Sequence, residues 1–256
     1  MLPKSVLDDL QKNYQEFVED LVLKDYCVGI KYTYAIVSGS KGKSIGLAYT
    51  PLEDMKLMVS QSPRIENLYE MLSSFNLMDR AMGLAILNAI SQYLLWNCEL
   101  HKKFEIHEGN LIDFISDKFS EPNTTIVVVG NMVPLVERLR KRHDRVLVLE
   151  RNPYLRGREL PDSLFGEVVP LADILIITGA TLVNGTIDFI LRIAKTDRIA
   201  LVGPTAGILP SGVEKISVIA SLRPMDIEKI KDTVKLGGGR WDFSKFCKDY
   251  IVTLLP

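Results

Sequence analysis

The second half of the chain alternates short aliphatic runs with stretches of helical periodicity. The runs are continuous in Val, Ile and Leu and span 125–129, 146–149, 174–178 and 199–202, with a weaker fifth at 216–220. The helical stretches that separate them are 134–142, 186–195 and 226–234. Continuous apolar runs are typical of strands buried on both faces, and their alternation with helices indicates βαβ units. We therefore predict an α/β fold, with a parallel sheet that carries helices on both faces.

The first hundred residues have a different pattern. A helical stretch near the start is followed by alternating side chains over 28–37, a turn of Gly, Ser and Lys at 38–44, and a returning run at 45–49. Alternation followed by a short turn and a second strand predicts a β-hairpin. We place the boundary between the two patterns within 100–123. The expected domains are a smaller α+β domain at 1–103 and the parallel-sheet domain at 104–256.

The helical stretch 80–97 is apolar nearly all round, which is typical of a helix covered on two sides. A narrow polar strip of Asn88, Ser91 and Gln92 interrupts its apolar surface. A solvated stripe would explain these side chains, but the flanking leucines argue against exposure, and a buried Asn needs hydrogen-bond partners. We predict that the strip faces the second domain and borders its ligand crevice.

Composition excludes several classes of protein. The 256 residues carry 31 Lys and Arg against 32 Asp and Glu, so there is no basic field for nucleic acid. The three Cys and three His lack the paired spacing of a zinc or dithiol site. No run approaches the ~18 apolar residues of a membrane span, and Asp8 and Asp9 interrupt any signal-peptide core. We expect a soluble, cytoplasmic protein, with a homodimer as the base-rate state.

Three of the predicted strands end in glycine, at Gly130, Gly179 and Gly203. In a parallel sheet the ligand crevice lies outside the carboxyl ends of the strands, and glycine there allows close approach of the backbone to a ligand. One such end would be a routine turn, but three favour a binding crevice. The residues that follow these glycines and are predicted to bind the ligand are Asn131, Thr181, Asn184, Pro204 and Thr205.

Glu150 ends the second strand, 20 residues after Gly130, where nucleotide-binding sheets place the carboxylate that holds a ribose. The turn after the first strand has only the first glycine of GxGxxG, and Pro134 removes an amide at the helix start, which disfavours a standard NAD site. A nucleoside-like or pterin-like ligand held by Glu150 stays open. The alternative is a solvated carboxylate paired with Arg151.

Two other glycine-rich segments have structural explanations. Residues 39–44 end like a phosphate-binding P-loop, but Val37 occupies the place of the first glycine and a strand follows, so we predict a hairpin tip. Lys41 or Lys43 reaching over a neighbouring site is the lesser alternative. The three glycines at 237–239 end the last helical stretch, and we predict a helix C-cap rather than a loop lying against a ligand.

Several strings resemble a known family. Residues 129–134, 176–186 and 201–205, together with Pro210 and the glycines at 237–239, are similar to the putative heavy-metal chelation family of prokaryotic proteins. The resemblance implies an enolase N-terminal-like domain followed by a Rossmann-like domain, with a site between them. It also implies a role in condensing or hydrolysing pterin-, flavin- or siderophore-like compounds. By the same resemblance, the site would combine Asn131, Thr181, Asn184 and Thr205 with Asn88.

Three functional hypotheses follow. The first is an enzyme acting on a small chelating compound, with Glu150 as acid, base or ligand anchor; the second is a non-catalytic binding protein for such a compound or its metal complex. The third is a methyltransferase that binds a methyl donor. Because there is no soft-ligand cluster, we expect metal to enter through a small chelating molecule. Direct binding of a hard ion by Glu53, Asp54 or Glu150 is the alternative.

Overall fold

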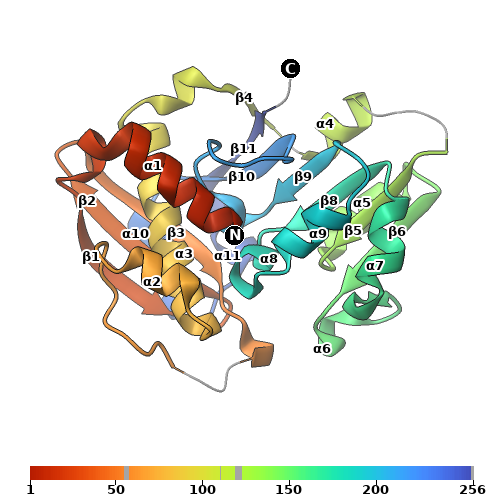
Figure 1. Ribbon diagram of the computed structural model, residues 1–256, viewed down its shortest axis with the longest axis horizontal. Helices are drawn as coiled ribbons and strands as arrows, with labels where there is room; N and C mark the ends of the chain where they lie inside the picture. The colour runs from red at the N-terminus through yellow and green to blue at the C-terminus, as the bar shows by residue number, and fades with distance from the viewer. Residues whose placement is uncertain (55–57, 110, 119–122, 255–256) are drawn as a thin grey trace.

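The computed structural model describes residues 1–54, 58–109, 111–118 and 123–254, which form two sheets with helix α3 between them (Figure 1). The smaller sheet is antiparallel, in the order β1-β2-β3, and consists of β1 (Val22–Val28), β2 (Tyr32–Gly39) and β3 (Gly42–Tyr49). The larger sheet has eight strands within the described ranges. Among the described residues, no helix has the length and apolar character needed to cross a bilayer.

The larger sheet has the order β4-β11-β10-β9-β8-β5-β6-β7. Its six strands from β10 to β7 pair in parallel, whereas β11 runs antiparallel to β10 and β4 antiparallel to β11. Since β6 and β8 lie on opposite sides of β5, the chain reverses its direction across the sheet at β5, the usual position of a ligand crevice. The strands are β4 (Glu105–Glu108), β5 (Thr125–Val129), β6 (Arg145–Glu150), β7 (Leu160–Pro161), β8 (Ile174–Thr178), β9 (Ile199–Val202), β10 (Val218–Pro224) and β11 (Cys247–Thr253).

Helices cover both faces of the larger sheet, as predicted. One face packs against α4 and α5 through a cluster that includes Ile115, Val136 and Leu139. The other face packs against α1, α3, α8 and α9 in a second, larger cluster (Figure 1). The helices are α1 (Leu2–Val18), α2 (Leu68–Ser73), α3 (Leu77–Gln92), α4 (Leu111–Lys118), α5 (Val133–Arg140), α6 (Pro153–Arg156), α7 (Phe165–Val168), α8 (Ala180–Asn184), α9 (Ile187–Ile193), α10 (Ile227–Lys235) and α11 (Arg240–Phe243).

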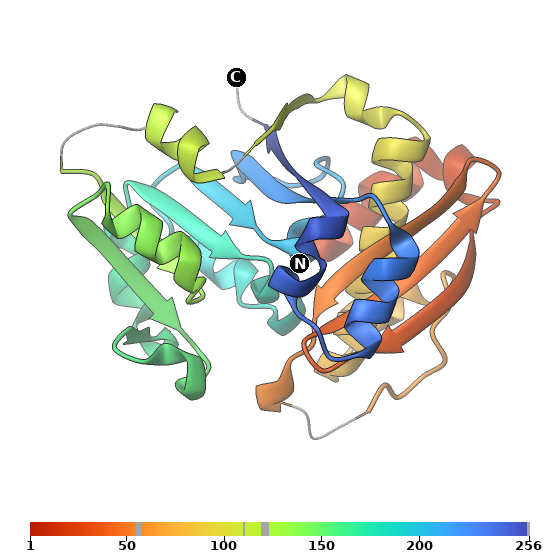
Figure 2. The ribbon, with the colours of Figure 1, turned by 180° about the vertical axis from the view of Figure 1, so that it is seen from behind.

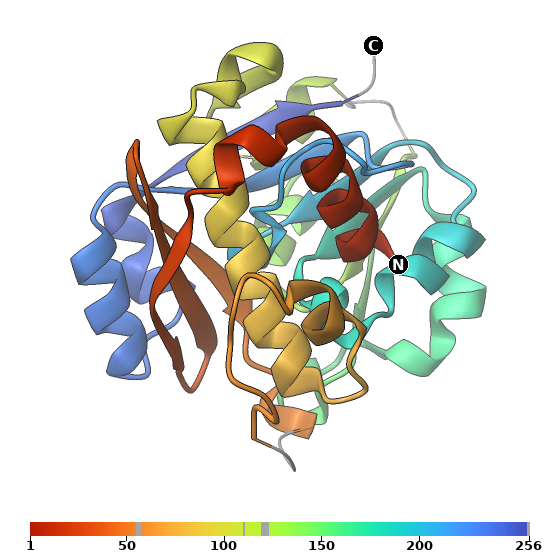
Figure 3. The same ribbon diagram turned by 60° about the vertical axis from the view of Figure 1, so that its left-hand side comes forward.

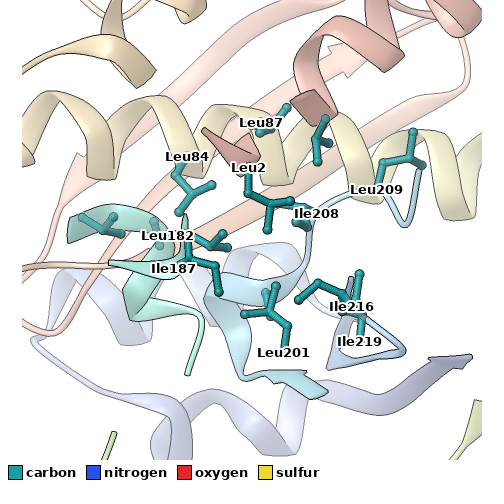
Figure 4. Close-up of a cluster of buried hydrophobic side chains, with 14 of the residues drawn as sticks. Leu2, Leu84, Leu87, Leu182, Ile187, Leu201, Ile208, Leu209, Ile216 and Ile219 are labelled. Carbon is teal, nitrogen blue, oxygen red and sulfur yellow. The ribbon is translucent and has the colours of Figure 1, made fainter. Parts of the chain in front are cut away.

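Helix α3 is buried on all sides, as its composition predicts. Every side chain from Ala81 to Gln92 is buried, and the helix continues for one π-helical turn over Tyr93–Asn97. Leu84 and Leu87 face Leu182 and Ile208 on the side of the larger sheet (Figure 4). The opposite side of α3 packs on β2 and β3. Because one continuous core joins both sheets through α3, the division into domains at 103/104 stays a prediction.

The smaller sheet is also covered on both faces. Its outer face packs against α10 and α11, where Ile230, Val234 and Phe243 meet Tyr34 and Ile45 (Figure 3). Helix α10 ends in the predicted C-cap: Gly237 has φ +81°, and the amides of Gly237 and Gly238 donate to the carbonyls of Val234 and Thr233. The remaining glycine is the N-cap of α11.

The predicted hairpin is present, but the predicted strand 28–37 was wrong at its start. The chain turns at 29–31, where the amide of Gly29 donates to the carbonyl of Tyr32, so this stretch belongs to two strands, β1 and β2. The tight turn at 39–42 joins β2 to β3, which confirms the hairpin tip. Lys41 lies there over the ring of Phe17. The tip lies at the start of β3. Tyr49 lies at the other end of this strand, next to the larger sheet, roughly 20 Å from the tip at ~3.3 Å per residue.

We predict that Gly46→Ala destabilises the protein. A Cβ at Gly46 would lie 2.1 Å from the amide nitrogen of Ala89 and 2.2 Å from the carbonyl oxygen of Ala85, so β3 and α3 would have to separate. We expect urea denaturation to show a loss of about 3 kcal/mol in the free energy of unfolding. Gly166→Ala is the matched control because no atom of the described residues lies within 4 Å of its Cβ position. Equal stability of the two variants would contradict this account of the α3 packing.

Candidate functional site

The three glycine-ended strands lie next to one another, but two of the glycines face protein. A Cβ at Gly130 would lie 2.6 Å from Thr178, and one at Gly179 would lie 2.6 Å from the amide of Ala206. These two glycines therefore allow neighbouring turns to pack closely. Gly203 differs, since it has φ +105° and, among the described residues, no atom within 4 Å of its Cβ position.

The polar side chains that follow these glycines are engaged within the protein. The Thr181 hydroxyl is buried and donates to the carbonyl of Thr178 at 2.7 Å. The Asn184 carbonyl oxygen accepts from the amide and hydroxyl of Thr186 at 3.1 and 2.7 Å. Ligand binding by Thr181 and Asn184 stays a prediction, and their observed contacts favour holding the turn after β8.

Asn88, Gln92 and Thr205 join the two sheets. The Asn88 side-chain amide donates to the carbonyls of Leu47 and Thr205 at 2.6 and 3.0 Å, and the residue is 1% exposed. The Thr205 hydroxyl accepts from the amide of Tyr49 at 2.9 Å. The Gln92 amide donates to the carbonyl of Gly207 and to the hydroxyl of Tyr250. The polar strip thus lies against the loops and strands of the larger sheet.

Glu150 holds two turns together. One carboxylate oxygen accepts from the amide of Asn131 at 2.6 Å, and the other accepts from the amide of Asn152 at 2.7 Å. The Asn131 side chain in turn donates to the carbonyl of Leu155 at 2.8 Å. These bonds favour a positioning role for Glu150. A catalytic role for Glu150 stays a prediction.

The turn after β5 has no amide left for a diphosphate. Across 130–136 each residue other than Pro134, which lacks an N–H, donates its amide to a carbonyl or, at Asn131, to the Glu150 carboxylate. Dinucleotide sites in related sheets use free amides at this helix start to bind phosphate oxygens. The hydrogen bonds therefore give a physical reason why a standard NAD site does not fit this turn.

Two carboxylates act on the Tyr49 phenol, one from each half of the chain. The Tyr49 hydroxyl donates to Glu53 at 2.9 Å. Burial, followed by the negative charges of Glu53 and Glu150, raises the pKa of Tyr49 above its ordinary value. Among the described residues, no three His, Cys, Asp or Glu side chains gather as a metal site. The Asp54 side chain lies outside the described part of the chain.

A cavity of about 330 Å³ lies beside Gly203. Strands β9, β10 and β11 contribute residues such as Ala220 to it, and the surrounding helices are α4, α5 and α11, which are visible from behind in Figure 2. We name this space the β9–β11 cavity. Besides Gly203, the chemically distinctive residues that line it are Arg138, Arg240, Trp241, Asp249 and Tyr250.

Sequence reasoning missed the charged and aromatic residues of this cavity. Arg138 occurs on the outer side of a helix, where arginine is ordinary. Arg240 and Trp241 follow directly after the three glycines at 237–239. That glycine run was the available signal, since it marks a sharp change in chain direction just before a long cationic and a large aromatic side chain.

Comparison with known families identifies the class of protein. Two family models, both described as "Putative heavy-metal chelation", match residues 12–91 and 113–253. The second match covers more than half of the chain, and the chain therefore belongs to this family, as its strings predict.

Relatives extend over nearly the whole chain. An uncharacterised protein of Methanocaldococcus jannaschii is 29% identical over 242 residues, which cover 91% of this chain and 90% of the relative. A crystal structure of a protein of unknown function from Pyrococcus horikoshii matches with a TM-score of 0.84 and 30% identity, covering 99% of this chain and 100% of that one. A further crystal structure, from Desulfitobacterium hafniense, has a TM-score of 0.78 and 17% identity, covering 98% and 97% of the two chains, and shows the shared fold.

We predict that Asn88→Ala lowers the free energy of unfolding by about 3 kcal/mol, because it leaves two buried carbonyls without their donor. Urea denaturation measures this loss. Asn13→Ala is the control, since Asn13 is exposed and its side chain donates to Asp9 within the same helix. A stable Asn88→Ala protein would show that this amide is dispensable for joining the sheets.

Buried phenols predict alkaline unfolding. Burial raises the pKa of Tyr32 and of Tyr250 to about 12 from an ordinary 10.0. Because the folded-state pKa lies above the unfolded one, this contribution to stability is complete below pH 10 and is lost as pH rises toward 12. Circular dichroism in a pH series should follow the loss. Tyr250→Phe should reduce this loss of stability between pH 10 and pH 12. Tyr154→Phe, at a residue 94% exposed, should leave the loss unchanged.

Proposed function

We propose that this protein binds a small organic metal chelator, or the metal complex of one, in the β9–β11 cavity. The observation that carries the proposal is the cavity itself, about 330 Å³ at the carboxyl end of β9. Small-molecule sites span roughly 300–1,000 Å³ and occur at this edge of parallel sheets. Pterin-, flavin- and siderophore-like compounds contain planar chelating groups of suitable size.

Two observations favour a chelator over a bare metal ion. The family description names heavy-metal chelation. Yet no cluster of three His, Cys, Asp or Glu side chains occurs within the described ranges of the chain, and soft metals need such ligands. A metal that reaches the protein inside an organic complex satisfies both observations, because the small molecule supplies the ligands.

Binding is supported better than catalysis. The phenol of the lining residue Tyr250 is already hydrogen-bonded to Gln92, and its pKa of about 12 is far from the range of a general acid or base at neutral pH. Glu150 accepts two backbone hydrogen bonds, which suits a positioning role. For a methyltransferase, the engaged amides of the turn at 130–136 provide little to hold a methyl donor. A condensing or hydrolysing enzyme is the second hypothesis.

The test is calorimetric titration with salicylate, dipicolinate and phenanthroline, each with and without Ni²⁺, and with Ni²⁺ alone. We expect one or more chelators, or their nickel complexes, to bind with one-to-one stoichiometry and the free ion to bind weakly. Ala220→Leu fills the floor of the cavity and should abolish chelator binding. Gly166→Ala, remote from the cavity, should bind like the wild type.

Two results would overturn the proposal. One is tight binding of free Ni²⁺ that Ala220→Leu leaves unchanged. The other is failure of every chelator and every complex to bind a wild-type protein whose thermal unfolding shows that it is folded.

A further inference from the structure

Two arginines of the β9–β11 cavity have hydrogen-bond donors that the protein does not use. The side chain of Arg138, on the exposed side of α5, has no hydrogen bond or ion pair with any residue in the described ranges. Arg240, on α11, makes one long contact of 3.4 Å with Asp249, and its Nε is buried without a partner. A guanidinium carries five N–H donors, so most of the donor capacity of both side chains is unused.

The unused Nε of Arg240 is costly in the absence of a ligand. The Arg240 side chain is 31% exposed as a whole, but its Nε is buried. Its positive charge also acts on Tyr32, where it opposes the effect of burial on the pKa. A buried polar group without a partner destabilises the folded state, and an acceptor that enters the cavity would relieve that cost.

The charges that line the cavity favour an anion. Arg138 and Arg240 carry two positive charges, against the single carboxylate of Asp249. The turns after β5 and β9 offer an anion few backbone donors, because the amides at 130–136 are engaged and Pro134 and Pro204 have none. A guanidinium binds carboxylate and phosphate oxygens through its planar fork.

The rim of the cavity carries an exposed aromatic ring. Trp241 is 63% exposed, and the Arg240 guanidinium lies 5.0 Å from the centre of its ring. The three glycines before α11 place Arg240 and Trp241 at this rim, because they end α10 and begin α11 within three residues. An exposed indole beside a cationic cavity is suited to stack on a planar ring.

We infer that the β9–β11 cavity takes a planar ring compound bearing an oxyanion, with Arg138 and Arg240 holding the oxyanion and Trp241 stacking on the ring. The inference rests on the proposed function and narrows its ligand class. A carboxylate and a phosphate share the chemistry that the arginines recognise, and the experiment separates them.

The test compares three probes by calorimetry at neutral pH: salicylate, its uncharged analogue salicylamide, and phenyl phosphate. We expect salicylate or phenyl phosphate to bind about tenfold or more tightly than salicylamide, the value of one lost charge-assisted hydrogen bond. Arg138→Gln and Arg240→Gln should each weaken the anionic probes about tenfold and leave salicylamide unchanged. Added salt should weaken the anionic probes selectively.

Three further variants give an effect of opposite sign, a control and a test of the aromatic ring. Asp249→Asn removes the carboxylate that competes for Arg240 and should tighten binding of the anionic probes. Arg158→Gln removes an arginine whose side chain is 81% exposed outside the cavity, and it should bind like the wild type. Trp241→Leu should weaken all three probes, because the ring contact does not depend on charge.

The outcomes separate this inference from the proposed function. Equal affinity for salicylate and salicylamide, with no effect of either arginine variant, would overturn the oxyanion inference while chelator binding in the cavity stood. If phenanthroline, which carries no oxyanion, were the one compound that bound, the oxyanion inference would likewise be overturned and chelator binding would stand. Failure of every probe and every chelator would overturn both. If Arg240→Gln lowers the melting temperature, Arg138→Gln, at an exposed position, carries the test.

Discussion

The burial of α3 between two sheets is the interaction on which the rest of the structure depends. Both sides of this helix are covered by apolar side chains, from β2 and β3 on one side and from the larger sheet on the other. Gly46 lets the helix approach the smaller sheet closely, and the Asn88 and Gln92 amides satisfy backbone carbonyls and a hydroxyl on the other side. The relative position of the two sheets, and therefore of every residue at their junction, follows from this packing.

Much of the fold could be predicted because its signals are local. Strands β5, β8 and β9 were predicted to the residue, since continuous β-branched runs bounded by glycine have few other interpretations. Strand β4, at the edge of the sheet, and its neighbour β11 were missed because both are partly exposed and of mixed composition, defined by their pairing rather than by their own pattern. The break between β1 and β2 was missed for a related reason: alternation continues through the turn at 29–31.

The candidate site was less accessible to sequence reasoning. Glycines at strand ends indicate close approach, but the sequence does not say whether a ligand or a neighbouring turn approaches. In the structure, Gly130 and Gly179 face neighbouring turns and Gly203 faces open space. Arg138 and Arg240 are 102 positions apart along the chain, and only the folded arrangement brings them to one cavity.

The two arginines of the cavity belong to different halves of the architecture. Arg138 is on α5, which packs on the larger sheet, whereas Arg240 begins α11, which packs with α10 on the outer face of the smaller sheet. The distance between the two guanidinium groups therefore depends on how the two sheets are placed relative to each other. A single anion that contacted both would link the two sheets, and its binding would depend on the packing around α3 that places them.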